Sequence, residues 1–146
     1  MEIQVHFIHL LYPTDIVTDI RNYNHFNPKE FNPILKLAIC EDKPSHYKII
    51  HTILQKYPHG AFEITYFASG DEFLRAIAEN GCPYSIVLTD IDLGSDTVNG
   101  ISLAERINHI SPDTQIIFIS QYLQYATAVY ETEHTYFIHK QQMEKY

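Results

Sequence analysis

Tyr84-Ser85-Ile86-Val87-Leu88-Thr89-Asp90-Ile91-Asp92 is the stretch that decides the fold. Residues 86–88 form a short, continuous apolar run, which is typical of a strand buried on both faces of a parallel sheet. The run ends at Asp90, a second carboxylate follows at Asp92, and Gly94 then breaks the chain. Because open α/β sheets bind ligands at the carboxyl ends of their strands, we expect Asp90 to lie at a functional site.

The composition of the chain favours a folded domain. Its 146 residues suit one domain, and 45 % of them are hydrophobic, which is too many for a disordered chain. The formal net charge is -8 without a basic cluster, which argues against a nucleic-acid site. We find neither an apolar run of about 18 residues, as a membrane span requires, nor a secretory signal. Two cysteines without a CxxC motif favour free thiols in the cytoplasm.

From residue 36 onward, short apolar stretches alternate with stretches of helical periodicity. This alternation predicts a flavodoxin-like α/β fold: a five-stranded parallel sheet of order 2-1-3-4-5 with helices on both faces and a truncated last helix. Residues 1–35 carry no motif and are expected to be an N-terminal extension of the domain at residues 36–146. The expected strands are residues 37–40, 62–66, 86–90, 116–119 and 136–139; the expected helices are residues 45–57, 70–80, 101–110 and 124–131. Ser45 is expected to cap the first of these helices, and Gly81 is expected to end the second.

Polar residues stand at the ends of four of these strands. Because the carboxyl ends of parallel strands lie along one edge of a sheet, we expect them to converge. Carboxylate oxygens suit Mg²⁺, and a carboxylate can also attack phosphorus to form an aspartyl phosphate. Phosphoryl transfer needs mainly positioning and neutralisation of charge, which an ammonium and a hydroxyl can help to supply. The strand-end residues are Glu41, Asp42, Asp90, Ser120 and Lys140.

Residues 37–140 resemble the receiver domain of bacterial two-component response regulators. Three landmarks look most like its LytTR-type subgroup: Ala38-Ile39-Cys40-Glu41-Asp42, Phe67-Ala68-Ser69-Gly70-Asp71-Glu72-Phe73-Leu74 and Asn99-Gly100-Ile101. The resemblance implies a signalling domain that takes a phosphoryl group from a sensor histidine kinase and then switches conformation. It is not expected to be an enzyme in the usual sense, although it can catalyse its own phosphoryl transfer and dephosphorylation.

The resemblance also implies partners beyond the kinase. The LytTR-type subgroup has a DNA-binding domain, which would follow residue 146, so DNA contact is expected only through a domain that this sequence does not contain. Receiver domains also form homodimers.

The resemblance assigns the phosphoryl chemistry to four residues. Asp90 is implied as the phosphoacceptor and Lys140 as the residue that pairs with the phosphoryl group. Ser120 is implied as the switch hydroxyl, which moves toward the phosphoryl group. Phe137 is implied as the switch aromatic, which turns into the vacated space. Together these movements would shift a population between two arrangements.

The resemblance assigns the metal chemistry to the acidic residues. Glu41 and Asp42 are implied as the pair that binds Mg²⁺, with Asp42 the more direct ligand. Asp90 and the backbone carbonyl of Asp92 complete the set. The nine histidines show no HExxH motif, and His46 and His51 have the wrong spacing for two ligands on one helix face, so we expect no metal at a histidine.

The sequence departs from the family pattern in three places. Gln121 stands where a small residue usually follows the switch hydroxyl, so it can hinder access to Asp90 or alter the loss of the phosphoryl group. Gln141 replaces the usual proline, and the last helix is short. A hypothesis that follows is that residues 1–35 pack over the sheet face that this helix would leave open.

Two other functions stay open at this point. One is a receiver-like interaction module that no longer accepts phosphate, with Gln121 and Gln141 as its symptoms. The other is a haloacid-dehalogenase-like phosphatase, because Asp90-Ile91-Asp92 has the form of its DxD nucleophile motif. In that family DxD lies on the first strand with further acids downstream, whereas here the acidic pair Glu41-Asp42 lies upstream.

Overall fold

The computed structural model describes residues 35–55, 62–94, 98–122, 124, 132 and 136–141. Its elements lie within the compact unit Ile34–Tyr146. Residues 1–34 of the predicted N-terminal extension, most of the helix expected at residues 124–131 and the last helix lie outside the described residues. Leu35, which is expected in the extension, begins the first strand instead. The elements are β1 (Leu35–Cys40), α3 (Pro44–Gln55), β2 (Phe62–Phe67), α4 (Gly70–Asn80), β3 (Ile86–Asp90), α5 (Gly100–Ile110), β4 (Gln115–Ser120) and β5 (Tyr136–His139).

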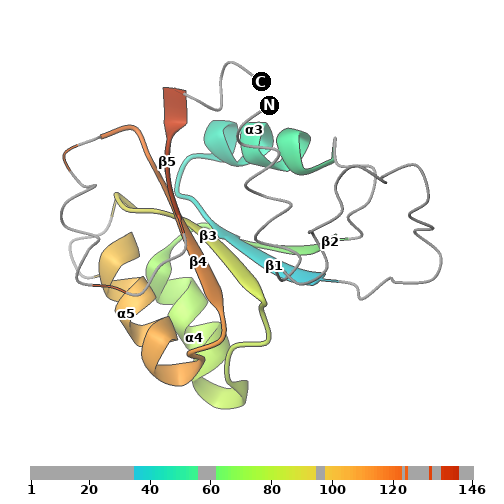
Figure 1. Cartoon of the computed structure of the whole chain (residues 1–146), viewed down its shortest axis with the longest axis vertical. Coiled ribbons are helices and arrows are strands. Elements are labelled where there is room, and N and C mark those ends of the chain that lie inside the picture. Colours follow the sequence, from blue (N-terminus) through green and yellow to red (C-terminus); the bar gives the residue numbers. More distant parts are fainter. Residues whose placement is uncertain are drawn as a thin grey trace, which may run out of the picture. The chain divides into compact units, whose positions relative to one another are not determined.

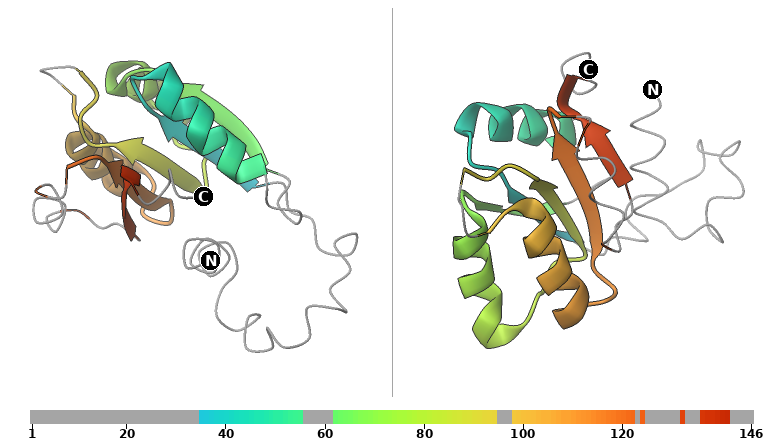
Figure 2. Two further views of the ribbon diagram at one scale, coloured as in Figure 1. Left: turned by 90° about the horizontal axis from the view of Figure 1, so that it is seen from above. Right: turned by 90° about the vertical axis from the view of Figure 1, so that its left-hand side faces the viewer.

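The five strands form one parallel sheet of order β2-β1-β3-β4-β5, which confirms the predicted order. Helix α3 covers one face of the sheet, and α4 and α5 cover the other (Figures 1 and 2). The central strand β3 is buried along its whole length, as its apolar run predicts. Among the described residues, no helix is long and apolar enough to cross a membrane.

The alternation of side chains along the strands divides the core between the two faces. On β1, Ala38 and Cys40 belong to the cluster that contains Phe73 of α4 and Leu103 of α5. Leu37 and Ile39 alternate with them and point to the other face, where α3 contributes Ile50 and Leu54 to the buried set.

The helix starts follow local capping chemistry, with one exception. Asn99 and Ser102 form a capping box at the start of α5, and Ser69 accepts a hydrogen bond from the backbone of Glu72 at the start of α4. The sequence predicts Ser45 as the cap of α3, which is wrong: the helix begins at Pro44, so Ser45 lies inside its first turn. Proline is favoured at the first helical position because the N–H it lacks would have no helical partner.

The buried thiol of Cys40 gives a test of the core. Burial raises its pKa to about 12, so it holds almost no thiolate, which is the reactive form, at pH 8. We expect iodoacetamide to modify half-buried Cys82 in the native protein and to spare Cys40, as measured by intact mass. In Cys82→Ser, labelling of the remaining Cys40 should require denaturant. Rapid labelling of Cys40 in the native variant would contradict the packing of β1.

Candidate functional site

Three strand-end residues meet at the carboxyl edge of the sheet. The ammonium Nζ of Lys140, after β5, lies 2.7 Å from Asp90 Oδ2 at the end of β3. The same nitrogen lies 2.9 Å from Oε2 of Glu41, the residue that directly follows β1. This oxygen forms an ion pair with Lys140 but no hydrogen bond of good geometry among the described residues. The structure therefore brings these three residues together, as the sequence predicts. Strands β1 and β3 are neighbours in the sheet, and the Lys140 side chain reaches Asp90 and Glu41 from the end of β5, which lies on the far side of β4.

The two other acidic residues lie around this centre. Asp42 is half-buried, and its Oδ1 atom is buried without a hydrogen-bond partner in the described part of the chain. A Cβ atom added at Gly94 would lie 3.0 Å from Asp42 Oδ2, so the loop after β3 passes close to this carboxylate. Asp92 has an exposed side chain, whose Oδ1 accepts a hydrogen bond from Gly94 N at 3.2 Å.

The two residues expected to switch lie on neighbouring strands. Ser120 is fully buried, and its Oγ accepts a hydrogen bond from Tyr122 N at 3.1 Å. It makes no hydrogen bond to Asp90 within the described residues. Phe137 pairs with Phe118 across β4 and β5 and packs, half-buried, against the core cluster on the α5 face.

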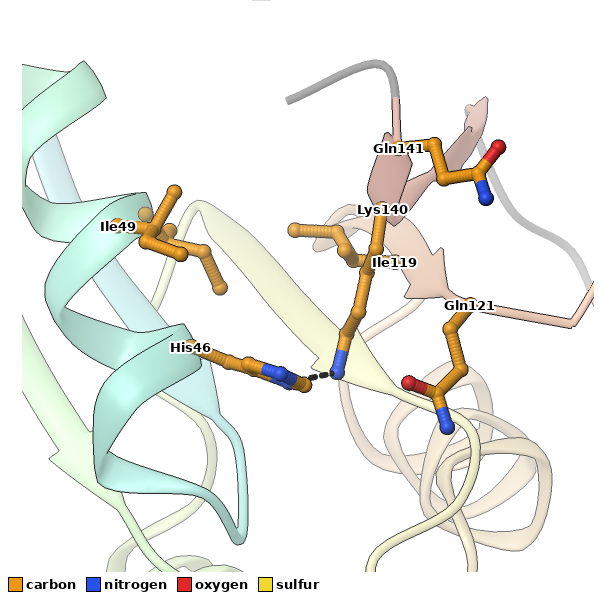
Figure 3. A pocket seen from close by; sticks show the side chains of 7 residues that line it. His46, Ile49, Ile119, Gln121, Lys140 and Gln141 are labelled. Atoms are coloured by element: carbon orange, nitrogen blue, oxygen red, sulfur yellow. Dashed lines mark hydrogen bonds between the residues drawn. The ribbon is translucent and has the colours of Figure 1, made fainter. Parts of the chain in front are cut away.

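His46 is a member of the site that the sequence prediction missed. Its Nδ1 atom lies 2.6 Å from Lys140 Nζ and 3.7 Å from Glu41 Oε1, and Figure 3 shows its ring extending from α3 toward the lysine. Its position in the sequence could have indicated this role, because it lies in the first turn of a helix that begins just after Glu41 and Asp42. A helical side chain leans toward the N-terminus of its helix, which here is the sheet edge.

Burial dominates the electrostatics of the site. It raises the pKa of Glu41 to about 7 and raises the pKa of Asp90, and the contacts of both carboxylates with the Lys140 ammonium only partly oppose this. Burial alone would lower the pKa of Lys140, but its contacts with Asp90 and Glu41 outweigh burial and hold that pKa above its usual value. One ammonium thus faces two buried carboxylates, and the site favours a further positive charge.

Two stacked tyrosines, Tyr66 and Tyr47, support the acidic loop, which is the segment after β1 that carries Glu41 and Asp42. The Tyr66 hydroxyl on β2 donates a hydrogen bond to the backbone carbonyl of Glu41 at 2.7 Å. The Tyr66 ring stacks on Tyr47 of α3 with centroids 4.1 Å apart, which limits its movement. The Glu41 side chain is fixed in turn, because its Oε1 accepts a hydrogen bond from Lys43 N at 3.1 Å.

A pocket of about 200 Å³ is lined in part by the Lys140 side chain (Figure 3). Both glutamines that depart from the family pattern line it, and both are exposed. The backbone carbonyl of Gln121 is in contact with His139 Nε2 at 2.9 Å. The lining residues are His46, Ile49, Ile50, Ile119, Gln121, Lys140 and Gln141.

Gly100 supports the end of β3 from the α5 side. Its backbone N–H donates to the carbonyl of Ile91 at 2.8 Å, and a Cβ atom at this position would collide with the carbonyl oxygen of Asp90. The Asn99-Gly100 landmark therefore has a steric basis: only glycine lets the helix start approach the backbone of Asp90 this closely.

We expect Gly100→Ala to lower the free energy of unfolding by about 3 kcal/mol, because a rigid backbone atom blocks the added methyl group. Urea unfolding followed by circular dichroism measures the loss. Gly70→Ala is the matched control, since Gly70 begins α4 as Gly100 begins α5, but an added Cβ there meets chiefly the side chain of Val98. Equal losses in the two variants would contradict the close contact at Asp90.

Comparison with known proteins identifies relatives of the chain. Residues 37–145 match the family described as the response regulator receiver domain. The chain is 29 % identical over 85 residues to response regulator receiver protein CpdR of Brucella abortus, which covers 58 % of this chain and 65 % of that protein. It is 31 % identical over 111 residues to accessory gene regulator protein A of Staphylococcus aureus, which covers 73 % of this chain and 46 % of that protein. The chain thus spans about two thirds of the first relative and about half of the second.

Solved structures share the fold. Response regulator protein TrrA of Thermotoga maritima, solved in complex with Mg²⁺-BeF, aligns with a TM-score of 0.60 at 20 % identity, covering 77 % of this chain and 98 % of that chain. The phosphorylated cyanobacterial phytochrome response regulator RcpA aligns with a TM-score of 0.65 at 14 % identity, covering 77 % and 88 %.

Proposed function

The chain belongs to the response regulator receiver family of two-component signalling, and from this premise we propose that Asp90 is its phosphoacceptor. Receiver domains are phosphorylated by sensor histidine kinases and bind Mg²⁺ as general features of the family. The observation that carries the assignment is the position of Asp90, buried at the end of the central strand and hydrogen-bonded to Lys140. Neither a phosphatase of the haloacid-dehalogenase type nor a phosphorylation-silent module is favoured by these relatives.

The acidic residues fit a magnesium ion. Asp42 Oδ1 is a buried oxygen without a hydrogen-bond partner among the described residues, and the two buried carboxylates exceed the charge of Lys140. We expect Glu41, Asp42, Asp90 and the backbone carbonyl of Asp92 to hold the ion, directly or through its waters. When bound, Mg²⁺ supplies charge neutralisation for the phosphoryl oxygens.

The residues of the chain account for the transfer step. Asp90 attacks the phosphorus of a phosphohistidine on the kinase, the new P–O bond forms as the P–N bond breaks, and the imidazole leaves with a proton. Lys140 then pairs with a phosphoryl oxygen instead of the free carboxylate. The same arrangement supports catalysis by the domain of its own phosphorylation and, with water as the nucleophile, of its dephosphorylation.

The conformational switch follows from competition for Ser120. In the structure its hydroxyl accepts a hydrogen bond from Tyr122 N, whereas a phosphoryl group on Asp90 offers strong acceptor oxygens nearby. Rotation of Ser120 toward that group opens space beside β4, and the half-buried Phe137 ring can turn into it. Phosphorylation would therefore shift the population toward a second arrangement of this surface.

The direct test is intact mass after incubation with acetyl phosphate and Mg²⁺. We expect one added phosphoryl group, which should be absent from Asp90→Asn and after chelation of Mg²⁺. Asp92→Asn is the matched control, because its exposed side chain lies two residues away and its proposed ligand is the backbone carbonyl. An adduct that persists in Asp90→Asn would place the phosphoacceptor elsewhere, and no adduct from a folded protein would favour the silent module.

The tyrosine pair gives a second test, on metal affinity. Tyr66→Phe keeps the ring on Tyr47 but removes the hydrogen bond to the Glu41 carbonyl, so the acidic loop is held less firmly. We expect the dissociation constant for Mg²⁺ to rise about tenfold by titration calorimetry. Tyr84→Phe is the control, because it also removes a tyrosine hydroxyl, but from a ring that packs against Phe67 and Phe73 and is not the donor to the Glu41 carbonyl. The same weakening in both variants would argue against a specific role of the hydrogen bond.

The wider setting of the domain is also a proposal. We place the chain in the LytTR-type subgroup on its landmarks, among them Asn99-Gly100-Ile101. This assignment would connect it to a DNA-binding output domain, to a cytoplasmic location and to a homodimer. Expression of a longer gene product and its binding to promoter DNA would test the assignment.

A further inference from the structure

The imidazole of His46 carries an unshared electron pair that points into the acidic site. Lys140 Nζ is an ammonium, which has three donors and no acceptor. At 2.6 Å from this nitrogen, His46 Nδ1 must therefore be the acceptor, with the ring proton on Nε2. Burial and the charge of Lys140 lower the pKa of His46, which agrees with a neutral ring. A neutral imidazole in this tautomer is the form that binds metal ions.

The ammonium of Lys140 already lies in a cation-binding position. It is 2.7 Å from Asp90 Oδ2, 2.9 Å from Glu41 Oε2 and 2.6 Å from His46 Nδ1. One potential ligand atom from each of these three partners lies within 4.8 Å of those of the other two. Three side chains, from the loop after β1, from α3 and from the end of β3, thus surround the one positive charge of the Lys140 side chain.

The ligand set differs from one made for Mg²⁺ alone. Mg²⁺ is held by oxygen ligands, and the acidic residues described above supply them without a histidine. A set of two carboxylates and one imidazole suits zinc and similar transition-metal ions, as in sites with mixed nitrogen and oxygen ligands and a remaining position for water. A divalent ion would also balance the two carboxylates, which the single charge of Lys140 does not.

We propose that Glu41, His46 and Asp90 form a site for a transition-metal ion such as Zn²⁺, which binds in exchange for the ammonium of Lys140. Such an ion would engage Asp90 and release Lys140, so it would compete with Mg²⁺ and oppose phosphoryl transfer. The site shares two residues with the proposed magnesium site, but metal binding does not require that Asp90 accept a phosphoryl group.

Titration calorimetry of Zn²⁺ into the full chain, without Mg²⁺ or phosphodonor, tests the site. We expect His46→Gln to raise the dissociation constant of the Zn²⁺ step by about tenfold or more, since it removes the nitrogen ligand. The affinity for Mg²⁺ should change less than about twofold, because Mg²⁺ prefers oxygen. His109→Gln is the matched control: this histidine is exposed in the last turn of α5.

A second variant tests the exchange with lysine. Lys140→Ala removes the tethered competitor, so Zn²⁺ should bind more tightly than to the parent chain; if His46→Gln fails to fold in circular dichroism, this variant carries the test. The proposal is overturned if Zn²⁺ affinity is unchanged in His46→Gln, if Mg²⁺ and Zn²⁺ weaken equally, or if Lys140→Ala weakens Zn²⁺ binding. Equal weakening would mean that His46 shapes the acidic loop and is not a ligand.

Discussion

The ammonium of Lys140 lies between the buried carboxylates of Asp90 and Glu41, and the rest of the site depends on this ionic contact. Removing two carboxylates from water is costly unless cations and hydrogen bonds compensate. One lysine compensates only in part, which is why burial raises the pKa of Glu41 to about 7 and raises that of Asp90. The incomplete balance leaves an excess of negative charge at the site, and the proposed metal binding depends on this excess.

The architecture keeps these charges together. Parallel strands place their carboxyl ends on one edge, so residues 41, 90 and 140 meet although they are far apart in the chain. Gly100 lets α5 approach the carbonyl of Asp90, and Tyr66 holds the carbonyl of Glu41. The site is therefore fixed from both sides of the sheet by groups that do not react themselves. This preorganisation is what phosphoryl transfer requires of a protein.

Prediction from the sequence succeeded where local pattern and topology act together. The β3 run, the Gly81 end of α4 and the sheet order followed from periodicity and handedness rules. The prediction that Ser45 caps α3 is wrong, because Pro44 already occupies the first helical position. Prediction from the sequence also missed His46, because a single histidine has no motif and its meaning depends on Lys140, which lies 94 residues away.

The sequence by itself determined that acids, a hydroxyl and a lysine end different strands of one parallel sheet, because side-chain period and strand order are local or topological properties. Only the tertiary structure decided which of them touch. In the structure Lys140 contacts both Asp90 and Glu41, and the Ser120 hydroxyl accepts a hydrogen bond from the backbone of Tyr122 in the loop that follows β4. The structure also brings His46 into contact with Lys140. Distances of 2.6 to 3.1 Å depend on the packing of several elements at once, and no single segment of the chain encodes them.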